Sequence, residues 1–270
     1  MAQTVWKGHL TFGLVSVPIR LYAAARTETV SFNQLHKTCG SRVKQKLFCP
    51  TCEKSVERSE LVKGAEVEGG RFVLIEEGDL QSIAPESGTS MEVLEFVKLE
   101  EVDPVYFDTS YYMVPENKAG EKPYFLLQKS LVEMQHAAIA KLSKANREHI
   151  VIVRPSGPGL MLHTLYYQDE VRQVADYGQN DGVQLSDKEL ELGKLFVSSL
   201  AAPFDASKYH DRYRENLTNL IAAKAQGQTI QAAAPTAPPP AMDLMAALKA
   251  SLERTQQVNP VVDASVTAQG

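Results

Sequence analysis

The sequence predicts a mainly β fold with helical additions. Short runs that alternate apolar and polar residues recur through the first 170 positions, separated by turn residues at a spacing typical of barrels and sandwiches. Fewer segments carry apolar residues at helical spacing. The chain has 270 residues, 44% hydrophobic and 23% charged, which is enough to bury a core and is ordinary for a globular protein.

The first strands are predicted from period-two alternation in Trp6–Phe12 and Val15–Tyr22. Pro18 has no N–H to donate, so we expect the second strand to lie at a sheet edge or to carry a bulge. Ser156–Gly159 has the composition of a tight turn between two strands. The later strands are expected at Arg71–Ile75, Val93–Val97, Tyr111–Pro115, His149–Arg154 and Leu160–Tyr167.

A long helix is expected over residues 124–144, with Pro123 near its start, where a missing N–H is harmless. Its apolar stripe steps by three or four residues and consists of Leu127, Leu131, Met134, Ala138 and Leu142.

Two shorter helices are expected in residues 179–227. Ser186 and Glu189 have the spacing of a capping box at the start of the first. Asp205 is expected to cap the second, and Gly227 to end it. The shared face of this second helix consists of Tyr209, Tyr213, Leu217 and Leu220.

The organisation that follows has five parts. Residues 1–178 form a β core, and residues 179–227 form a small helical domain. Residues 228–241 are a Pro/Ala-rich linker, stiff and exposed. Residues 242–254 form an amphipathic helix with Met245, Leu248 and Leu252 in line, and residues 255–270 are a disordered tail.

Charge is distributed unevenly along the chain. Residues 1–63 carry ten Lys and Arg against four Asp and Glu, a net of +6, and residues 64–123 carry four against fourteen, a net of −10. The whole chain has a formal net charge of −5. An acidic total therefore does not exclude a basic face that binds phosphates.

Three cysteines and one histidine have the spacing of a zinc site. His36 and Cys39 form one pair, and Cys49 and Cys52 form a second pair after nine intervening residues. Zinc prefers four tetrahedral nitrogen and sulfur ligands, and a two-residue gap lets both members of a pair reach one ion. The set predicts a structural zinc with no open position for catalysis. The alternative is a lone buried or redox Cys49–Cys52 pair.

Basic side chains surround this loop. Lys44 and Lys46 alternate along an expected strand, so both would face one way and could follow a phosphate backbone. A merely solvated face is the alternative. The candidate cluster consists of Arg20, Lys37, Arg42, Lys44, Lys46 and Lys63.

The sequence contains no phosphate-binding loop, dinucleotide fingerprint or nucleophile elbow, so we expect no enzyme. His149 and His163 fall in apolar strands, where packing or a local hydrogen bond is the ordinary role. No apolar run suits a membrane helix or a signal peptide, which predicts a cytoplasmic protein.

Five phrases, in order along the chain, resemble the bacterial Ku family. They begin at Trp6 (WKGHLTFGLVSVPIRLY), Leu61 (LVKG), Tyr111 (YYMVP), Arg147 (REHIVIVRP) and Tyr209 (YHDRY). Each phrase alone is weak evidence for the family. All five occur in the same order over nearly the whole chain, to about Arg254, and together they are specific for it.

The resemblance implies a homodimer in which seven-stranded β-barrels and interlocked arms form a ring on a double-stranded DNA end. Such proteins hold the duplex without reading its sequence and need no cofactor for that role. The resemblance assigns 124–167 to barrel trim and a dimer-forming bridge. It thereby adds Lys141, Lys144 and Arg147 to the DNA-facing candidates, in a protein associated with the nucleoid.

The resemblance also implies recruitment of the ATP-dependent DNA ligase D for non-homologous end joining. We expect the helical domain to make that contact, through Tyr209, Tyr213 and Leu217. Many bacterial members end in a lysine-rich extension, but no Lys or Arg follows Pro260 here. Two other classes stay open: a zinc-ribbon adaptor that binds proteins, and a small hydrolase or lyase.

Overall fold

A computed structural model describes residues 3–83, 89–144, 147–172, 184–228, 249 and 251. The chain falls into two compact units, Met1–Asp176 and Tyr177–Gly270. The mainly β fold with helical additions is confirmed. No helix among the described residues is long and apolar enough to cross a membrane.

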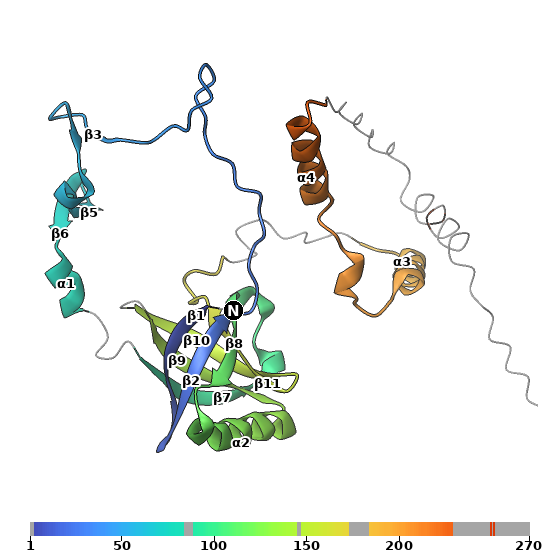
Figure 1. Cartoon of the computed structure of the whole chain (residues 1–270). Helices are drawn as coiled ribbons and strands as arrows, with labels where there is room; N and C mark the ends of the chain where they lie inside the picture. The colour runs from blue at the N-terminus through green and yellow to red at the C-terminus, as the bar shows by residue number, and fades with distance from the viewer. Residues whose placement is uncertain are drawn as a thin grey trace, which may run out of the picture. The chain divides into compact units, whose positions relative to one another are not determined.

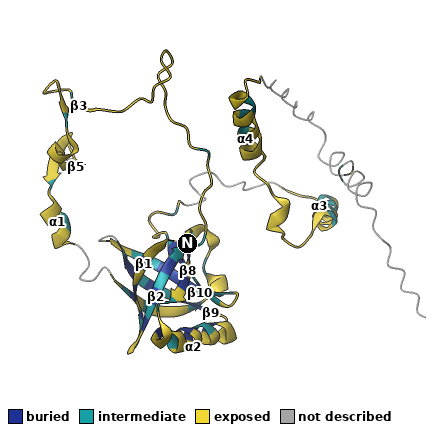
Figure 2. Cartoon of the chain, in the orientation of Figure 1, coloured by how far each residue is buried: buried dark blue, intermediate teal, exposed yellow. Residues whose placement is uncertain are grey.

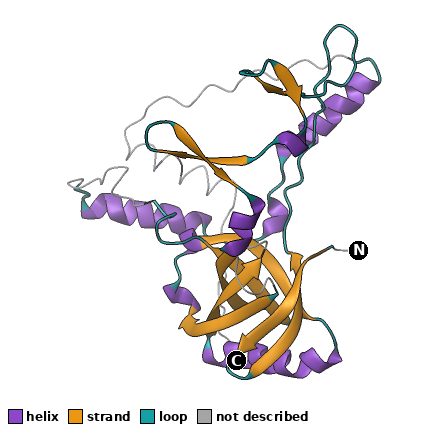
Figure 3. Ribbon diagram, turned by 90° about the vertical axis from the view of Figure 1, so that its left-hand side faces the viewer, coloured by secondary structure: helices purple, strands orange, loops and turns teal. Residues whose placement is uncertain are grey.

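A closed seven-stranded barrel forms the core of the first unit (Figures 1 and 3). Its strand order is β1-β2-β8-β11-β10-β9-β7, and every neighbouring pair is antiparallel except β1 and β7. The bounds are β1 (Thr4–Phe12), β2 (Val15–Ala23), β7 (Ser90–Lys98), β8 (Phe107–Pro115), β9 (His136–Lys144), β10 (Arg147–Ser156) and β11 (Gly159–Leu165). The expected barrel strands and the turn at Ser156–Gly159 are confirmed.

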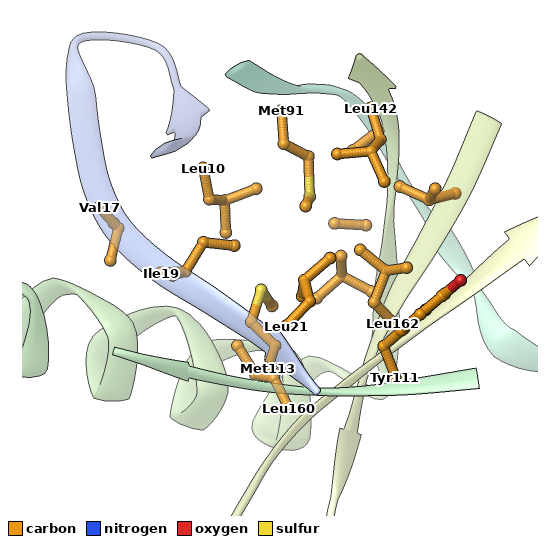
Figure 4. Close-up of a cluster of buried hydrophobic side chains, with 14 of the residues drawn as sticks. Leu10, Val17, Ile19, Leu21, Met91, Tyr111, Met113, Leu142, Leu160 and Leu162 are labelled. Carbon is orange, nitrogen blue, oxygen red and sulfur yellow. The ribbon is translucent and has the colours of Figure 1, made fainter. Parts of the chain in front are cut away.

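Alternate residues of these strands fill the barrel interior. On β2, Val17, Ile19 and Leu21 are fully buried, whereas Arg20 and Tyr22 between and beyond them are only half-buried. Figure 4 shows side chains of several strands meeting in one cluster, and Figure 2 shows buried residues concentrated in the barrel. Period-two burial is what a strand with one face in a core requires.

The barrel closes where β1 meets β7, along a short parallel seam of three residue pairs that begins at His9 and Ser90. The Trp6 indole is 7% exposed and donates to the Ser143 carbonyl on β9 at 3.1 Å. A Cβ atom on Gly8 would lie 2.2 Å from the Thr89 carbonyl oxygen and 2.4 Å from the Trp6 ring, so there is no room for a side chain. Only glycine lets the strands and the indole approach this closely.

The prediction that Pro18 marks a sheet edge or a bulge is wrong, because β2 pairs with β1 on one side and β8 on the other, and the β1 register is continuous through Pro18. The Pro18 carbonyl accepts from the Glu116 N–H at 2.9 Å, so its N side also points toward β8. The β8 ladder begins only at Ile19 and Pro115. The Pro18 nitrogen therefore faces Glu116, just past the end of β8, and the missing N–H removes no hydrogen bond from the β8 ladder.

The expected helix over 124–144 is also wrong at both ends. The segment 124–167, which the resemblance assigns to barrel trim and a dimer-forming bridge, lies largely in helix α2 (Lys118–Met134) and the barrel strands β9, β10 and β11. Pro123 lies in the second turn of α2. Gln135 has φ 55° and ends the helix, and residues from His136 onward form β9. A spacing of four fits both a helix and a strand, which explains the error.

Helix α2 packs against the barrel through Tyr124. Its hydroxyl donates to the Met113 carbonyl at 2.7 Å and accepts from the Leu160 N–H at 2.8 Å. One side chain thus joins the helix to β8 and β11.

Residues 24–89 leave the barrel after β2 and return at β7, and we call this segment the arm. It carries two hairpins, β3–β4 and β5–β6. The bounds are β3 (Leu47–Cys49), β4 (Lys54–Val56), η1 (Arg58–Glu60), β5 (Lys63–Val67), β6 (Arg71–Ile75) and α1 (Glu77–Ser82). The predicted strand through Lys44 and Lys46 is wrong, because β3 begins at Leu47.

The second unit contains α3 (Asp187–Leu200), η5 (Ala206–Lys208) and α4 (Arg212–Ala225). The capping box of Ser186 and Glu189 is confirmed. Asp205 caps η5 and not the second helix, whose cap is Asp211. Tyr209 consequently precedes α4. Gly227, with φ 74°, follows the helix end as expected.

The linker of 228–241 lies outside the described residues apart from Gln228, as do the tail of 255–270 and most of the 242–254 segment. Within that segment, the structure describes Lys249 and Ser251 as helical.

Candidate DNA interface and zinc loop

Four cations of the arm that form no ion pair with the described residues lie before β3. Lys37, Arg42, Lys44 and Lys46 are exposed, and none has an ion-pair partner among the described residues. Gln34 and Val43 share a backbone hydrogen bond of 2.9 Å, which closes a loop around Lys37 and Arg42. Free ammonium and guanidinium groups on such a loop are available to phosphates.

Arg20 is engaged within the protein. Its guanidinium lies 3.2 Å from Glu116 Oε1, and Lys7 Nζ lies 2.6 Å from the same oxygen. The hydrogen bond from Lys7, followed by that from Arg20, lowers the pKa of Glu116. One carboxylate thus offsets part of the charge of Lys7 and of the candidate phosphate ligand Arg20.

Two further candidates are also paired with carboxylates. Lys63 lies 3.4 Å from Glu77, and Lys141 lies 3.1 Å from Glu148. Exposed ion pairs of this kind stabilise weakly, so a competing phosphate could displace either carboxylate.

Lys144 and Arg147 are brought together, because they are opposite partners in the β9–β10 ladder. Lys144 Nζ contacts the Tyr111 hydroxyl at 3.2 Å and lies 4.9 Å from the centre of that ring. Neither cation has an ion-pair partner among the described residues. Like charges directly opposite on a ladder repel, and an anion would relieve that repulsion.

The predicted zinc ligands form two local pairs. His36 Nδ1 lies 3.1 Å from Cys39 Sγ, within a turn in which Gly40 donates to the His36 carbonyl. Cys49 ends β3, and Cys52 lies in the turn before β4. Among the described residues, no three His, Cys, Asp or Glu side chains form a group that could hold a metal.

Each pair contains one thiol whose pKa is lowered. Hydrogen bonds from Ser41, with a smaller one from His36, lower the pKa of Cys39 to about 7. Hydrogen bonds from Cys52 lower the pKa of Cys49, whereas the side-chain hydrogen bond with Cys49 and then the charge of Cys49 raise the pKa of Cys52. Thiolates are the form that binds zinc, so the donor chemistry suits the ion.

A Ser–His contact between β8 and β11 does not have the arrangement of a nucleophile and its base. His163 Nδ1 lies 2.8 Å from Ser110 Oγ, and Arg154 Nε donates to His163 Nε2 at 2.9 Å. Because Nε2 accepts from the guanidinium, Nδ1 carries the proton and donates to the hydroxyl. His163 therefore makes local hydrogen bonds and cannot take the Ser110 proton.

The three residues expected to contact a ligase differ in setting. Tyr209 and Tyr213 are 72% and 74% exposed, whereas Leu217 is half-buried. Tyr213 and Leu217 share one face of α4. Tyr209 precedes the helix and stacks on Phe204, with ring centroids 6.0 Å apart. Phe204 is 83% exposed, and the sequence reasoning missed it because it falls outside any periodic segment.

The sequence reasoning also missed the exposed apolar side chains of the arm. Phe72 and Leu74 are 66% and 64% exposed on β6, although every residue of this strand after Arg71 is apolar. Every described residue of β5 and nearly every one of β6 is exposed. A strand of this composition with no core to cover it is the signal that could have identified a contact surface.

Comparison with known proteins gives a consistent result. A family of barrel proteins described as "Ku70/Ku80 beta-barrel domain" matches residues 11–192. Proteins named "Non-homologous end joining protein Ku" are similar over most of their length. That of Solibacter usitatus is 47% identical over 256 residues, covering 95% of each chain. That of Bacillus subtilis is 34% identical over 271 residues, covering 99% of this chain and 87% of its own.

A third relative of the same name, from Koribacter versatilis, is 47% identical over 253 residues and is covered to 86%. The match to the barrel domain and these relatives define a Ku-type barrel protein. The chain belongs to the Ku family, as the resemblance indicated.

The buried His163 predicts a pH dependence of stability. Burial, and secondarily the charge of Arg154, lower its pKa below 6.5. As pH falls below 6.5 the unfolded chain binds a proton that the folded protein resists, so stability is lost toward the depressed folded pKa. His163→Gln should therefore lose less stability than wild type between pH 7 and pH 5, measured by urea unfolding. His210→Gln, on an exposed segment, is the control. Equal losses in wild type and His163→Gln would contradict this role.

Proposed function

We propose that the protein binds ends of double-stranded DNA as a homodimeric ring, without reading sequence, in non-homologous end joining. The main support for the proposal is that the arm of this Ku-family chain has exposed cations together with exposed apolar strands. The role is that of a non-enzymatic scaffold in the cytoplasm, acting at the nucleoid.

The proposed DNA contacts are of two kinds. Lys37, Arg42, Lys44 and Lys46 are free to release counterions from phosphates, which gives sequence-independent affinity. Lys144 and Arg147 form a second group on the barrel. Arg20, Lys63 and Lys141 contribute less on this reading, because each must first exchange a carboxylate for a phosphate.

The deciding experiment compares binding to linear and covalently closed circular duplexes of one sequence, by gel shift across a salt series. We expect preference for the linear form. Lys44→Ala with Lys46→Ala should reduce the slope of log K against log salt by about 0.9 for each phosphate that the variant no longer neutralises. Lys188→Ala, an exposed lysine of α3, should leave the slope unchanged.

The other outcomes correspond to the other classes of protein. Absence of binding to either duplex would favour the protein-binding adaptor, and strand cleavage or base loss would favour an enzyme.

Self-association through the arm is supported by what its strands leave uncovered. The exposed large apolar residues of this segment include Phe48 (59%), Leu61 (52%), Val62 (65%), Phe72 (66%) and Leu74 (64%). Apolar area of this kind is stable in water when a partner surface covers it. A second copy's arm offers the same surface, as a two-fold interface requires.

Phe72→Asp should convert a dimer into a monomer of 29.7 kDa, because a charge would be buried at the contact. Light scattering reports the mass directly. Val105→Asp, at an exposed apolar position of η3 (Pro104–Tyr106), should remain dimeric. A wild-type mass of one chain would remove the basis for the ring.

We also propose that one structural zinc joins His36 and Cys39 to Cys49 and Cys52. Support comes from the paired spacing, the thiolate-favouring hydrogen bonds and a donor set that zinc prefers. Lys44 and Lys46 lie between the two pairs, so the ion would brace the loop that carries them.

Metal analysis of the purified protein should find about one zinc per chain, as expected of a four-ligand structural site. Cys49→Ser should lose most of it, because three ligands hold the ion less tightly. Thr51→Ala alters the same turn without removing a ligand and should keep the metal. Equal, negligible zinc in all three proteins would exclude the site.

Recruitment of the ATP-dependent DNA ligase D is proposed for the second unit. Tyr209 and Tyr213 are large, rigid and exposed, the properties of side chains that dominate protein interfaces. Leu217 supports the same face of α4.

Tyr213→Ala should weaken ligase D binding by roughly thirtyfold, since an interface tyrosine of this kind contributes about 2 kcal/mol. Surface plasmon resonance with the purified ligase measures the effect. Asn219→Ala, on the other side of α4, is the matched control. Unchanged affinity in Tyr213→Ala would place the contact elsewhere.

A further inference from the structure

Helix α3 presents an uncovered apolar groove. In the described part of the chain, no residue of α3 is buried. A groove of about 450 Å³ runs along it, with Leu185, Leu190 and Val197 as its apolar walls and Glu189 and Lys194 at its rim. These three walls are 47% to 69% exposed. The groove lies wholly within the second unit.

The groove has a small residue on its lining. Gly193 lies in mid-helix, where glycine costs about 1 kcal/mol relative to alanine. Its backbone does not need glycine, because its φ is not positive, and a Cβ atom would meet nothing within 4 Å. A small residue between larger ones is suited to receive a large side chain from a second helix.

The same unit carries a segment of matching pattern. In residues 242–254, Met245, Leu248 and Leu252 are spaced by three and four positions. Leu190, Gly193 and Val197 have the same spacing on α3. Where the structure describes this segment it is helical, with Lys249 exposed and Ser251 half-buried. The apolar face of a helix with this sequence pattern needs a partner surface.

The connection is about twice as long as the helix that precedes it. The fourteen residues of 228–241 can span about 43 Å at the 3.1 Å per residue of a proline-rich linker. Helix α4, which precedes the linker, has 14 residues and is about 21 Å long. A tether of this length holds the segment at roughly millimolar effective concentration.

We propose that residues 242–254 dock as a helix in the α3 groove of their own chain, with Leu248 seated over Gly193. The segment would then complete the hydrophobic core of the second unit, which α3 and α4 lack on their own. This assignment does not depend on DNA binding.

Amide hydrogen exchange of α3 in the full chain tests the proposal. Leu248→Asp should speed exchange of the α3 amides by about tenfold or more, because the charge cannot enter the groove. Lys249→Ala, on the exposed face, should have no such effect. Amides of the buried barrel strands serve as a folding control in every variant.

Gly193→Leu separates docking from a local effect on the helix. Leucine favours helix more than glycine does, so with an empty groove α3 would exchange more slowly than in wild type. If the groove holds Leu248, the new side chain expels the segment and exchange becomes faster. Trypsin should then also cut faster after Lys249.

Three results would overturn the proposal. The first is α3 exchange that Leu248→Asp leaves unchanged. The second is protection that grows with protein concentration, which indicates the segment of a second copy. The third is protection that appears only when ligase is added, which makes the ligase the occupant.

Discussion

The short parallel seam between β1 and β7 is the contact on which the rest of the first unit depends. Only three residue pairs join these strands, and the other six pairings of the barrel are antiparallel. The Trp6 indole reinforces the seam from inside by bonding the Ser143 carbonyl, beyond β7 on β9. Gly8 lets this ring lie flat against its own strand. Without closure here, β1 and β7 would become exposed edges.

The charges of the first unit divide into structural and available groups. Glu116 forms ion pairs with Lys7 and Arg20 at the barrel surface. The cations between Lys37 and Lys46 form no ion pair with a carboxylate of the described residues. This division refines the view of one uniform basic N-terminal region. The net charge of +6 over residues 1–63 is therefore larger than the positive charge that is available to bind phosphates.

The sequence predicted the barrel well, because period-two burial in β1, β2 and β8 follows directly from one face lying in the core. The prediction failed where the spacing of apolar residues fits both a helix and a strand. Ala138 and Leu142 continue the stripe of Leu127 and Leu131 at a spacing of four, yet Gln135 adopts a left-handed conformation that no propensity argument would place there. Candidate residues could be named by type, but their partners, such as Glu116 for Arg20, depend on tertiary contacts far apart in the chain.

The position of the arm in the topology has a consequence for how this fold can vary. The arm leaves at the end of β2 and returns at the start of β7, and both strands border β1. Since Tyr22 is opposite Thr4 and Ser90 is beside His9, its two ends are separated by about five residues along β1 and two strand spacings across it. That is roughly 20 Å, which about six extended residues could span. The arm is thus a modular insertion, free to lengthen, shorten or be exchanged while the register of every barrel strand stays the same.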